Sequence, residues 1–222
     1  MLRKAIVFLF LLAHISVSSQ EKYHKTYYKN GDLKSEGRLI DFKKNGYWFT
    51  YHSNKRIASK GEYLLGKKTG YWFEYYANQQ VKNQGRYHHN QKVAFWKMYA
   101  KNGDKVSEGN YVFGLKNEYW KFYYPNQGVS KEGFYTKGVK TKTWKYYQAN
   151  GNLETIGHYK LNLKNGFWIA YDENKHKTNE GYYKNDLREG YWKAYHPKGI
   201  LKKEGHYKQN KQIKYWYFYR KN

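Results

Sequence analysis

A column of basic side chains is the first feature of this sequence with a chemical use. Counted from each tryptophan, the twentieth residue is Lys or Arg in six consecutive copies, and a further lysine stands in phase before them. The members are Lys44, Lys68, Lys92, Lys116, Lys140, Lys164 and Arg188. Evenly spaced cations favour docking of an extended anionic partner, whereas lysines in turns are commonly just solvated. We expect the column to line one edge of a sheet, and both interpretations stay open.

Glutamate is the candidate general acid, because it recurs twelve residues after the tryptophan position. The members are Glu36, Glu108, Glu132, Glu180 and Glu204. Each has an expected cross-strand or solvent partner, so ion pairing explains the column without catalysis. The nine histidines do not recur with carboxylates at the spacing of metal ligands, and no phosphate loop or nucleophile elbow is present. We therefore expect that the protein is not an enzyme and that it has no metal site and no cofactor.

The elements that position these side chains follow a 24-residue period. The eight tryptophans are Trp48, Trp72, Trp96, Trp120, Trp144, Trp168, Trp192 and Trp216. Thirteen residues after a tryptophan stands a glycine, at Gly61, Gly85, Gly109, Gly133, Gly157, Gly181 and Gly205. Tyrosines recur three and fifteen residues after the tryptophans. Repeat proteins bury such residues in a continuous core, so we assign the columns to the core and keep stacking of flat ligands as the alternative.

Turn residues divide each repeat into two strands. Asn102-Gly103 follows a tryptophan segment, and Gly66 or Asn162 follows a glycine segment. If the first turn occupies positions five to eight after the tryptophan, each tryptophan lies opposite the glycine of its own hairpin and covers it. If the second turn occupies positions 18 to 21, the tyrosine two residues after that glycine lies opposite the next tryptophan.

The fold class that follows is all-β, an elongated, twisted antiparallel β-meander built from about eight 24-residue β-hairpin repeats. We expect one continuous repeat domain of about 16 to 18 strands. Residues 47–222 carry the regular repeats, and residues 20–46 carry a degenerate copy with His24 at the tryptophan position. Terminal repeats are commonly atypical, so we interpret 20–46 as a capping repeat.

Residues 1–19 have the pattern of a secretory signal peptide. Arg3 and Lys4 precede the apolar run AIVFLFLLA, and small residues stand before Gln20. This run is shorter than the roughly 20 apolar residues of a spanning helix, and an uncleaved anchor is the alternative. We expect cleavage near Ser19-Gln20, export to the periplasm or the medium, and no transmembrane helix in the mature chain.

Composition limits the function classes further. The chain has 222 residues with 42 Lys and Arg against 17 Asp and Glu, a formal net charge of +25, which favours an anionic partner. Disorder is disfavoured by the 8 Trp, 28 Tyr and 11 Phe, because disordered chains are poor in aromatic residues. The absence of cysteine excludes disulfides, zinc–cysteine sites, thiol catalysis and lipidation at cysteine.

The repeat unit resembles the MORN-repeat variant family, as GYWFEYYANQQVKNQGRY at 70–87 and GYWKAYHPKGILKKEGHY at 190–207 illustrate. The resemblance covers about residues 24–220 and implies a β-hairpin repeat architecture. It implies no catalytic group, because the shared residues are structural. Bacterial chains with this repeat are often labelled as antitoxin components of toxin–antitoxin pairs, and the resemblance implies that label here.

The function we expect is binding. An exported, non-enzymatic scaffold would present a basic, tyrosine-rich surface to a protein partner or to an anionic polysaccharide or lipid of the envelope. The alternative is an antitoxin or immunity-type protein that neutralises one dedicated toxin. Nucleic acid is a disfavoured partner, because the signal peptide directs the chain out of the cytoplasm. The repeat pattern leaves the oligomeric state open.

Overall fold

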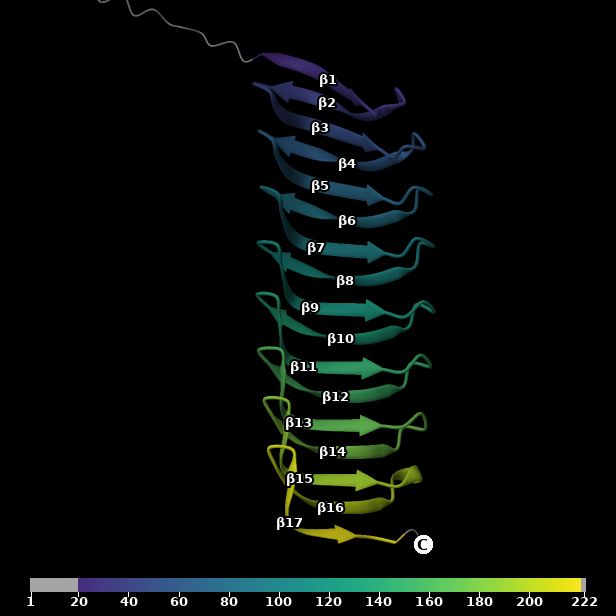
Figure 1. The fold of residues 1–222 in the computed structure, drawn as a ribbon, viewed down its shortest axis with the longest axis vertical. Helices are drawn as coiled ribbons and strands as arrows, with labels where there is room; N and C mark the ends of the chain where they lie inside the picture. Colours follow the sequence, from purple (N-terminus) through teal and green to yellow (C-terminus); the bar gives the residue numbers. More distant parts are fainter. Residues whose placement is uncertain (1–19, 221–222) are drawn as a thin grey trace, which may run out of the picture.

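The computed structural model describes residues 20–220, which form one antiparallel sheet of 17 strands. Each strand pairs with its neighbours in sequence, so the sheet is an open meander (Figure 1). The predicted all-β meander is confirmed. The expected signal peptide lies outside the described residues. Within 20–220, no helix has the length and apolar character needed to cross a membrane.

Strands that carry a tryptophan alternate with strands that carry a glycine. The elements are β1 (Glu21–Tyr27), β2 (Leu33–Ile40), β3 (Lys43–Tyr51), β4 (Ile57–Leu64), β5 (Lys67–Tyr75), β6 (Val81–His88), β7 (Gln91–Tyr99), β8 (Lys105–Val112), β9 (Leu115–Tyr123), β10 (Val129–Thr136), β11 (Val139–Tyr147), β12 (Leu153–Lys160), β13 (Leu163–Tyr171), β14 (Lys177–Lys184), β15 (Leu187–Tyr195), the short 3-10 helix η1 (Pro197–Gly199), β16 (Leu201–Lys208) and β17 (Lys211–Phe218). In β1, His24 takes the tryptophan position and lies opposite Gly37.

Each internal tryptophan lies between two glycines. Trp48 lies opposite Gly61 of the next strand, as predicted, and also opposite Gly37 of the preceding strand. Its indole ring covers Gly37, where a Cβ would lie closer than 3.0 Å to the ring, while Gly61 is covered by Trp72. The expectation that a ring covers the glycine of its own hairpin was therefore wrong. Only glycine leaves space for a ring laid directly on the neighbouring strand.

The two turns of the repeat differ in how well the sequence predicts them. The longer loop, between β3 and β4 for example, occupies residues 52–56 and falls where we expected it. The other turn consists only of Leu65 and Gly66, both with positive φ as in a type I′ turn. The prediction of a turn at positions 18 to 21 was wrong, and Tyr63 lies opposite Lys68 instead of the next tryptophan.

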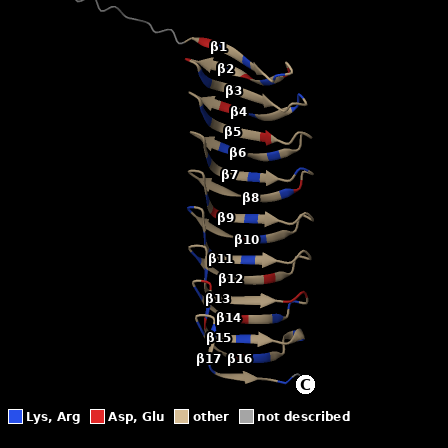
Figure 2. Cartoon of the chain, viewed as in Figure 1, with Lys and Arg blue, Asp and Glu red and all other residues tan. Residues whose placement is uncertain are grey.

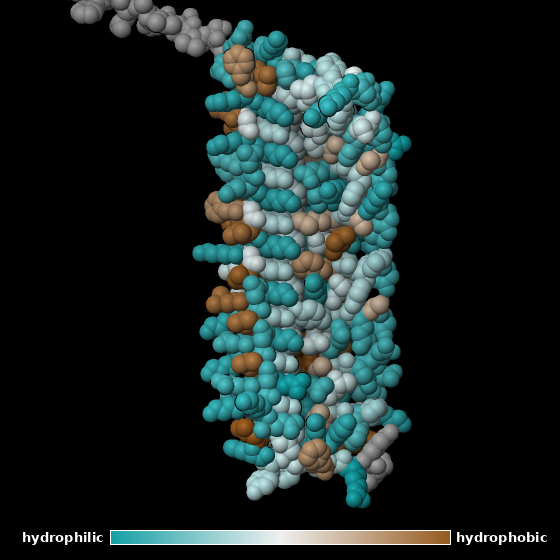
Figure 3. Space-filling view, in the orientation of Figure 1, coloured by the Kyte–Doolittle hydropathy of each residue, from teal (hydrophilic) through white to brown (hydrophobic). Residues whose placement is uncertain are grey.

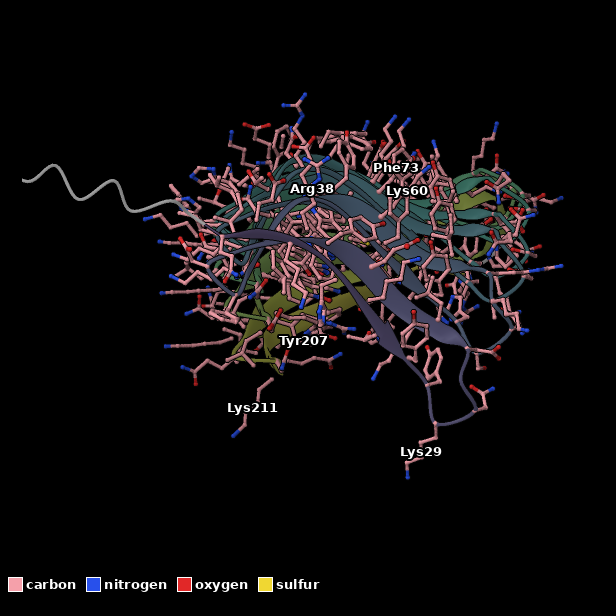
Figure 4. All side chains as sticks on the ribbon, turned by 90° about the horizontal axis from the view of Figure 1, so that it is seen from above. Lys29, Arg38, Lys60, Phe73, Tyr207 and Lys211 are labelled. Carbon is pink, nitrogen blue, oxygen red and sulfur yellow. The ribbon has the colours of Figure 1, made fainter. Side chains whose placement is uncertain are left out.

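A two-residue bulge follows this short turn. Glu62 pairs with Thr69, but Lys60 pairs with Phe73, so β5 contains two residues that have no partner on β4. Gly70 in this bulge has a φ of 63°. Positive φ also recurs at the equivalent positions Gly46, Ala94, Glu118, Lys142, Gly166, Gly190 and Lys214. Bulges bend strands, and this repeated bend gives the sheet the arched cross-section seen from above in Figure 4.

The core lies on the concave side of the arch. The tryptophans from Trp48 to Trp192 are at most 5% exposed. Each packs edge-on between two tyrosines: the ring centroid of Trp72 is 5.1 Å from that of Tyr63 and 6.0 Å from that of Tyr87. The indole Nε1 of Trp72 also donates to the main-chain oxygen of Thr69 at 2.9 Å, beside the bulge. The indole ring therefore fills the space inside the bend, and its hydrogen bond holds the bulge in place.

Candidate binding groove

Three rows of side chains run along the concave face and cross the strands. The tryptophan row alternates tryptophan with glycine. On one side lies the tyrosine–lysine row, with the members Lys44, Tyr63, Lys68, Tyr87, Lys92, Tyr111, Lys116, Tyr135, Lys140, Tyr159, Lys164, Tyr183, Arg188 and Tyr207. On the other side lies a variable row, with the members Ser59, Glu74, Asn83, Met98, Ser107, Phe122, Lys131, Tyr146, Thr155, Ala170, Asn179, Ala194 and Lys203. Figure 4 shows Tyr207 under the arch and Arg38 and Phe73 on its outer side.

The basic column lies inside the trough and not at an edge of the sheet. The Nζ of Lys68 is 4.2 Å from the ring centroid of Trp72 and 4.9 Å from that of Tyr87. From Lys44 to Arg188, the cation lies 4.2 to 5.0 Å from the tryptophan centroid in every repeat. The expectation of an edge was wrong, because the two-residue bulge moves these residues from the turn onto the strand. Each cation is held over an indole face by a cation–π contact.

The concave face carries positive charge with little compensation. Burial lowers the pKa of Lys116 and Lys140, and the positive charge of Lys131 lowers both pKa values further. Burial likewise lowers the pKa of Lys44 and Lys92. Glu74 is the sole acidic residue among the members of the three rows. Basic residues recur along the whole length of the stack (Figure 2).

The convex face is built from hydrogen bonds and ion pairs. Lys121 pairs with Glu132 in the predicted register, with 4.0 Å between Nζ and a carboxylate oxygen. The hydroxyl of Tyr147 donates to the same carboxylate at 2.6 Å, and Tyr51 donates to Glu36 at 2.5 Å. Glutamates of the candidate acid column therefore hold tyrosine and lysine partners. Among residues 20–220, no group of three or more His, Asp or Glu is placed to hold a metal ion.

Besides the indole ring, the group that each cation contacts depends on the neighbouring residue of the variable row. The Nζ of Lys68 is 3.7 Å from a carboxylate oxygen of Glu74, and that of Lys140 donates to the hydroxyl of Tyr146 at 3.0 Å. This row is not apparent from the sequence, because its residues share no type. Their constant distance of two or eleven residues from a tryptophan is the only signal, and it becomes informative once the register is known.

The variable row is empty at two places near the C-terminal end. Alanine at positions 170 and 194 leaves two neighbouring hollows, of about 170 and 110 Å³. The larger is lined by Thr155, Lys164, Trp168, Ile169, Ala170, Asn179, Tyr183, Arg188 and Trp192. The smaller shares Asn179, Arg188 and Trp192 with it and adds Ala194, Lys203 and Tyr207, among others. Lys164 and Arg188 therefore lie beside space that larger side chains of the variable row occupy in other repeats.

Exposed apolar side chains gather at the short turns. Phe42 is 91% exposed, Phe113 70% and Leu161 66%. Figure 3 shows brown side chains in a column along the edge where these turns lie. We call the set Phe42, Leu65, Phe113 and Leu161 the apolar ridge.

Three segments match a family model described as the MORN repeat variant, at residues 20–40, 140–161 and 188–209. Their starting points are separated by whole multiples of the 24-residue period, so each match begins at the same phase of the repeat. The matched segments together cover less than half of the chain, and each is similar to the MORN repeat variant. In the second and third matches, the stretch runs from a cation of the tyrosine–lysine row through the tryptophan to the next glycine strand, whereas the first match begins at Gln20 and has His24 at the tryptophan position. Among curated proteins, no sequence matches the chain.

Solved structures similar to this sheet include a crystal structure of TcdB2-TccC3-Cdc42, with 12% identity, a TM-score of 0.23, and coverage of 87% of this chain and 13% of that chain. A Tc holotoxin pore from Photorhabdus luminescens has 11% identity, a TM-score of 0.21, and coverage of 81% and 12%. A Bacteroides fragilis protein with unknown function has 9% identity, a TM-score of 0.12, and coverage of 86% and 95%. The chain spans only 12 to 13% of the length of the toxin chains that it matches.

Proposed function

We propose that this protein is an exported, non-enzymatic scaffold that binds an extended acidic polymer of the cell envelope along its concave face. The observation that carries the proposal is the cation ladder, the column from Lys44 to Arg188 with one cation over one tryptophan in each repeat. Two strands per repeat place successive cations about 9 to 10 Å apart.

The spacing of the ladder suits a polymer better than a compact ligand. The potentials of neighbouring cations overlap, because their separation is close to the Debye length of about 8 to 10 Å at moderate salt. A trough with low-dielectric walls focuses this field along its axis. An extended polyanion can meet many of these cations at once, whereas a compact anion meets one or two.

An anion in the trough would relieve an electrostatic cost of the fold. Burial and neighbouring lysines lower the pKa of Lys116 and Lys140, so the folded state holds these charges unfavourably. Binding of a negative group beside them raises those pKa values again and so favours the complex. The aromatic rings under the cations keep the ammonium groups in place, which reduces the ordering cost of binding.

The proposal has two further parts: the protein has no enzymatic activity, and it is exported. The residue columns that recur are structural and carry no catalytic constellation, which supports a binding role. Export is supported by the signal pattern of residues 1–19.

The test compares two triple variants of the full chain. In the first, Lys92, Lys116 and Lys140 of the ladder are changed to Gln. In the control, Lys97, Lys121 and Lys145 are changed to Gln, which removes the same charge from the convex face of the same strands. The probes are polygalacturonate and dextran sulfate, titrated at several salt concentrations.

We expect the ladder variant to bind both probes about tenfold more weakly and with a shallower salt dependence, and the control to stay within about threefold of the wild type. Equal losses in both variants would show that net charge alone drives binding and would overturn the groove. Absence of binding by the wild type to either probe would overturn the proposed function.

A protein partner, such as a toxin, is the second candidate. The apolar ridge favours it, because exposed apolar side chains in a row mark protein contacts more often than polysaccharide contacts. Capture of one envelope protein that survives high salt and is unaffected by both triple variants would favour this candidate over the first.

A further inference from the structure

One carboxylate already lies in the groove, and its surroundings show what the groove offers to such a group. Oε1 of Glu74 is 3.7 Å from Nζ of Lys68, and Oε2 accepts a 2.9 Å hydrogen bond from Nδ2 of Asn83. Tyr87, whose pKa is raised to about 12 by burial and then by the charge of Glu74, faces the same carboxylate. So does Lys92, where burial lowers the pKa and the charge of Glu74 opposes that shift.

The repeat that contains Trp168 has the same kinds of side chain at these four positions but no carboxylate. Four periods of 24 residues separate the two places, so Lys68, Asn83, Tyr87 and Lys92 correspond to Lys164, Asn179, Tyr183 and Arg188, and Glu74 corresponds to Ala170. All four corresponding side chains line the hollow of about 170 Å³. Nζ of Lys164 lies 4.6 Å from the Trp168 centroid and 5.0 Å from the Tyr183 centroid, in the same pose as Lys68.

We propose that the hollow beside Ala170 binds a carboxylate of the polymer in the position that Glu74 occupies in its own repeat, and that the group bound is a uronate residue of an acidic polysaccharide. This inference rests on the proposed function and names its ligand. The cation and the amide are present at the corresponding positions, and the Glu side chain that would contact them is replaced by a methyl group.

Arginine at one place in the ladder supports a carboxylate ligand. Arg188 is the sole arginine of the seven ladder residues, and it lines both hollows. Its Nη1 donates to the hydroxyl of Tyr207 at 3.2 Å, which orients the guanidinium and leaves further N–H donors for a ligand. Guanidinium groups bind carboxylates through two parallel hydrogen bonds, which a lysine cannot do.

The size and the lining of the hollow favour a sugar as the carrier of the carboxylate. A cavity of about 150 Å³ accommodates a six-membered ring, and the hollow beside Ala170 has about 170 Å³. Besides the cations, Thr155 and Asn179 offer neutral hydrogen-bonding groups and the methyl group of Ala170 offers a small apolar surface. A uronate has all three complements, namely a carboxylate, hydroxyl groups and an apolar ring face.

The second hollow lies one unit further along the groove and shares part of the arrangement, with Lys203 in place of the amide. Ala194 takes the place of Glu74 there, and Arg188, Lys203 and Tyr207 line a space of about 110 Å³. The two hollows are therefore separated by one repeat, or about 9 to 10 Å along the groove. A polysaccharide with uronates at regular intervals could place carboxylates in both at once.

The experiment exchanges the two repeats. Ala170→Glu supplies the hollow with its own carboxylate, and Glu74→Ala opens an equivalent hollow near Lys68. The matched control is Met98→Glu, which adds the same charge to the variable row in a repeat without a hollow. The full chain is titrated calorimetrically with tetragalacturonate, its methyl ester and tetraglutamate, and thermal unfolding checks that each variant folds.

We expect Ala170→Glu to weaken tetragalacturonate binding about tenfold and Met98→Glu to weaken it less than about threefold. Glu74→Ala should retain full affinity or bind a second equivalent, and this arm keeps the test valid if Ala170→Glu does not fold. The methyl ester should not bind, because it lacks the negative charge.

Three results would overturn the inference while leaving the proposed function in place. Equal losses for Ala170→Glu and Met98→Glu would mean that only the overall charge of the groove matters. Equal binding of the methyl ester would exclude the carboxylate contact. Tetraglutamate binding as tight as that of tetragalacturonate, and equally sensitive to Ala170→Glu, would assign the site to an acidic peptide. If the wild type binds neither dextran sulfate nor polygalacturonate, the proposed function itself is overturned.

Discussion

The concave and convex faces of this sheet use the same strands but hold together by different forces. On the concave face, buried indole rings lie on glycine and cations lie on the rings. On the convex face, tyrosine hydroxyls and lysines meet glutamates at more exposed positions. The concave contacts, ring on glycine and cation on ring, recur in every internal repeat, whereas the convex contacts are hydrogen bonds and ion pairs that change from repeat to repeat.

This difference determines where the protein tolerates change. A ring packed against a backbone leaves no space for an extra atom, so the concave glycine and tryptophan columns are invariant from Gly37 to Trp216. A surface hydrogen bond or ion pair contributes about 1 kcal/mol or less and can be replaced by water. Stability should therefore depend mainly on the concave face, and changes in binding should come from the ladder and the variable row beside it.

The largest effect is expected from one added methyl group in the concave core. In Gly109→Ala, the Cβ would lie closer than 3.0 Å to the indole of Trp120, which is 0% exposed. Relieving this clash requires the ring to leave its place in the bend, so we expect a loss of about 3 kcal/mol in the free energy of unfolding. Urea denaturation followed by tryptophan fluorescence measures the loss.

Gly114→Ala serves as the matched control. Gly114 lies in the following short turn, has a φ of 78°, and has nothing within 4 Å of a built Cβ. Only the cost of a left-handed alanine applies there, about 1 kcal/mol. Equal losses for both variants would mean that the contact between ring and glycine does not determine the stability of the concave face.

A smaller effect, with a pH dependence, is expected on the convex face. The hydrogen bond from Tyr51 is the main cause that lowers the pKa of Glu36 below 4.5, against burial, which raises it. The stability that this lowered pKa represents is present above pH 4.5 and is lost as the pH falls through the lower, folded-state pKa. Tyr51→Phe should therefore cost about 1 kcal/mol at pH 7 and progressively less in acid. Thermal unfolding of both proteins between pH 7 and pH 3 measures this difference.

Tyr75→Phe controls for loss of a hydroxyl in the same column. At the position that corresponds to Glu36, the repeat of Tyr75 has Lys60, which lies over the ring and does not accept from the hydroxyl. We expect its cost to stay below about 0.5 kcal/mol and to be independent of pH. A pH-dependent cost in both variants would show that Glu36 is not the acceptor that matters.

The sequence predicted the features that depend on invariant columns. The register of Trp48 with Gly61 followed from the spacing and from the loop at 52–56. The bulge could not be predicted, because its left-handed position is Gly70 in one repeat but Glu118 or Lys142 in others, so it leaves no column of a single residue type.

That missed bulge explains the errors in the candidate site. A slip of two residues moves Lys68 from a turn to a place opposite Tyr63, and so moves the whole basic column into the trough. The hollow beside Ala170 depends on the same slip and on the absence of a side chain beyond Cβ. Pattern reasoning detects what recurs, and this site arises where one repeat departs from the pattern of another.

The smallest effect on stability is expected from the cation ladder itself. Lys116→Met removes a charge whose pKa is lowered by burial, by Lys131 and by Lys92, and it also removes a cation–π contact with Trp120. The relief of buried charge and the lost contact, worth about 0.5 to 1 kcal/mol, oppose each other. We therefore expect a change below about 0.5 kcal/mol at low salt. Because salt screens the repulsion along the ladder, added NaCl should stabilise the wild type more than Lys116→Met.

The control is Lys121→Met on the convex face, which loses the ion pair with Glu132, so its stability relative to the wild type should improve as salt is added. If thermal unfolding shows the same salt response in both variants, the two faces do not differ in their electrostatics, and the ladder is an ordinary solvated surface.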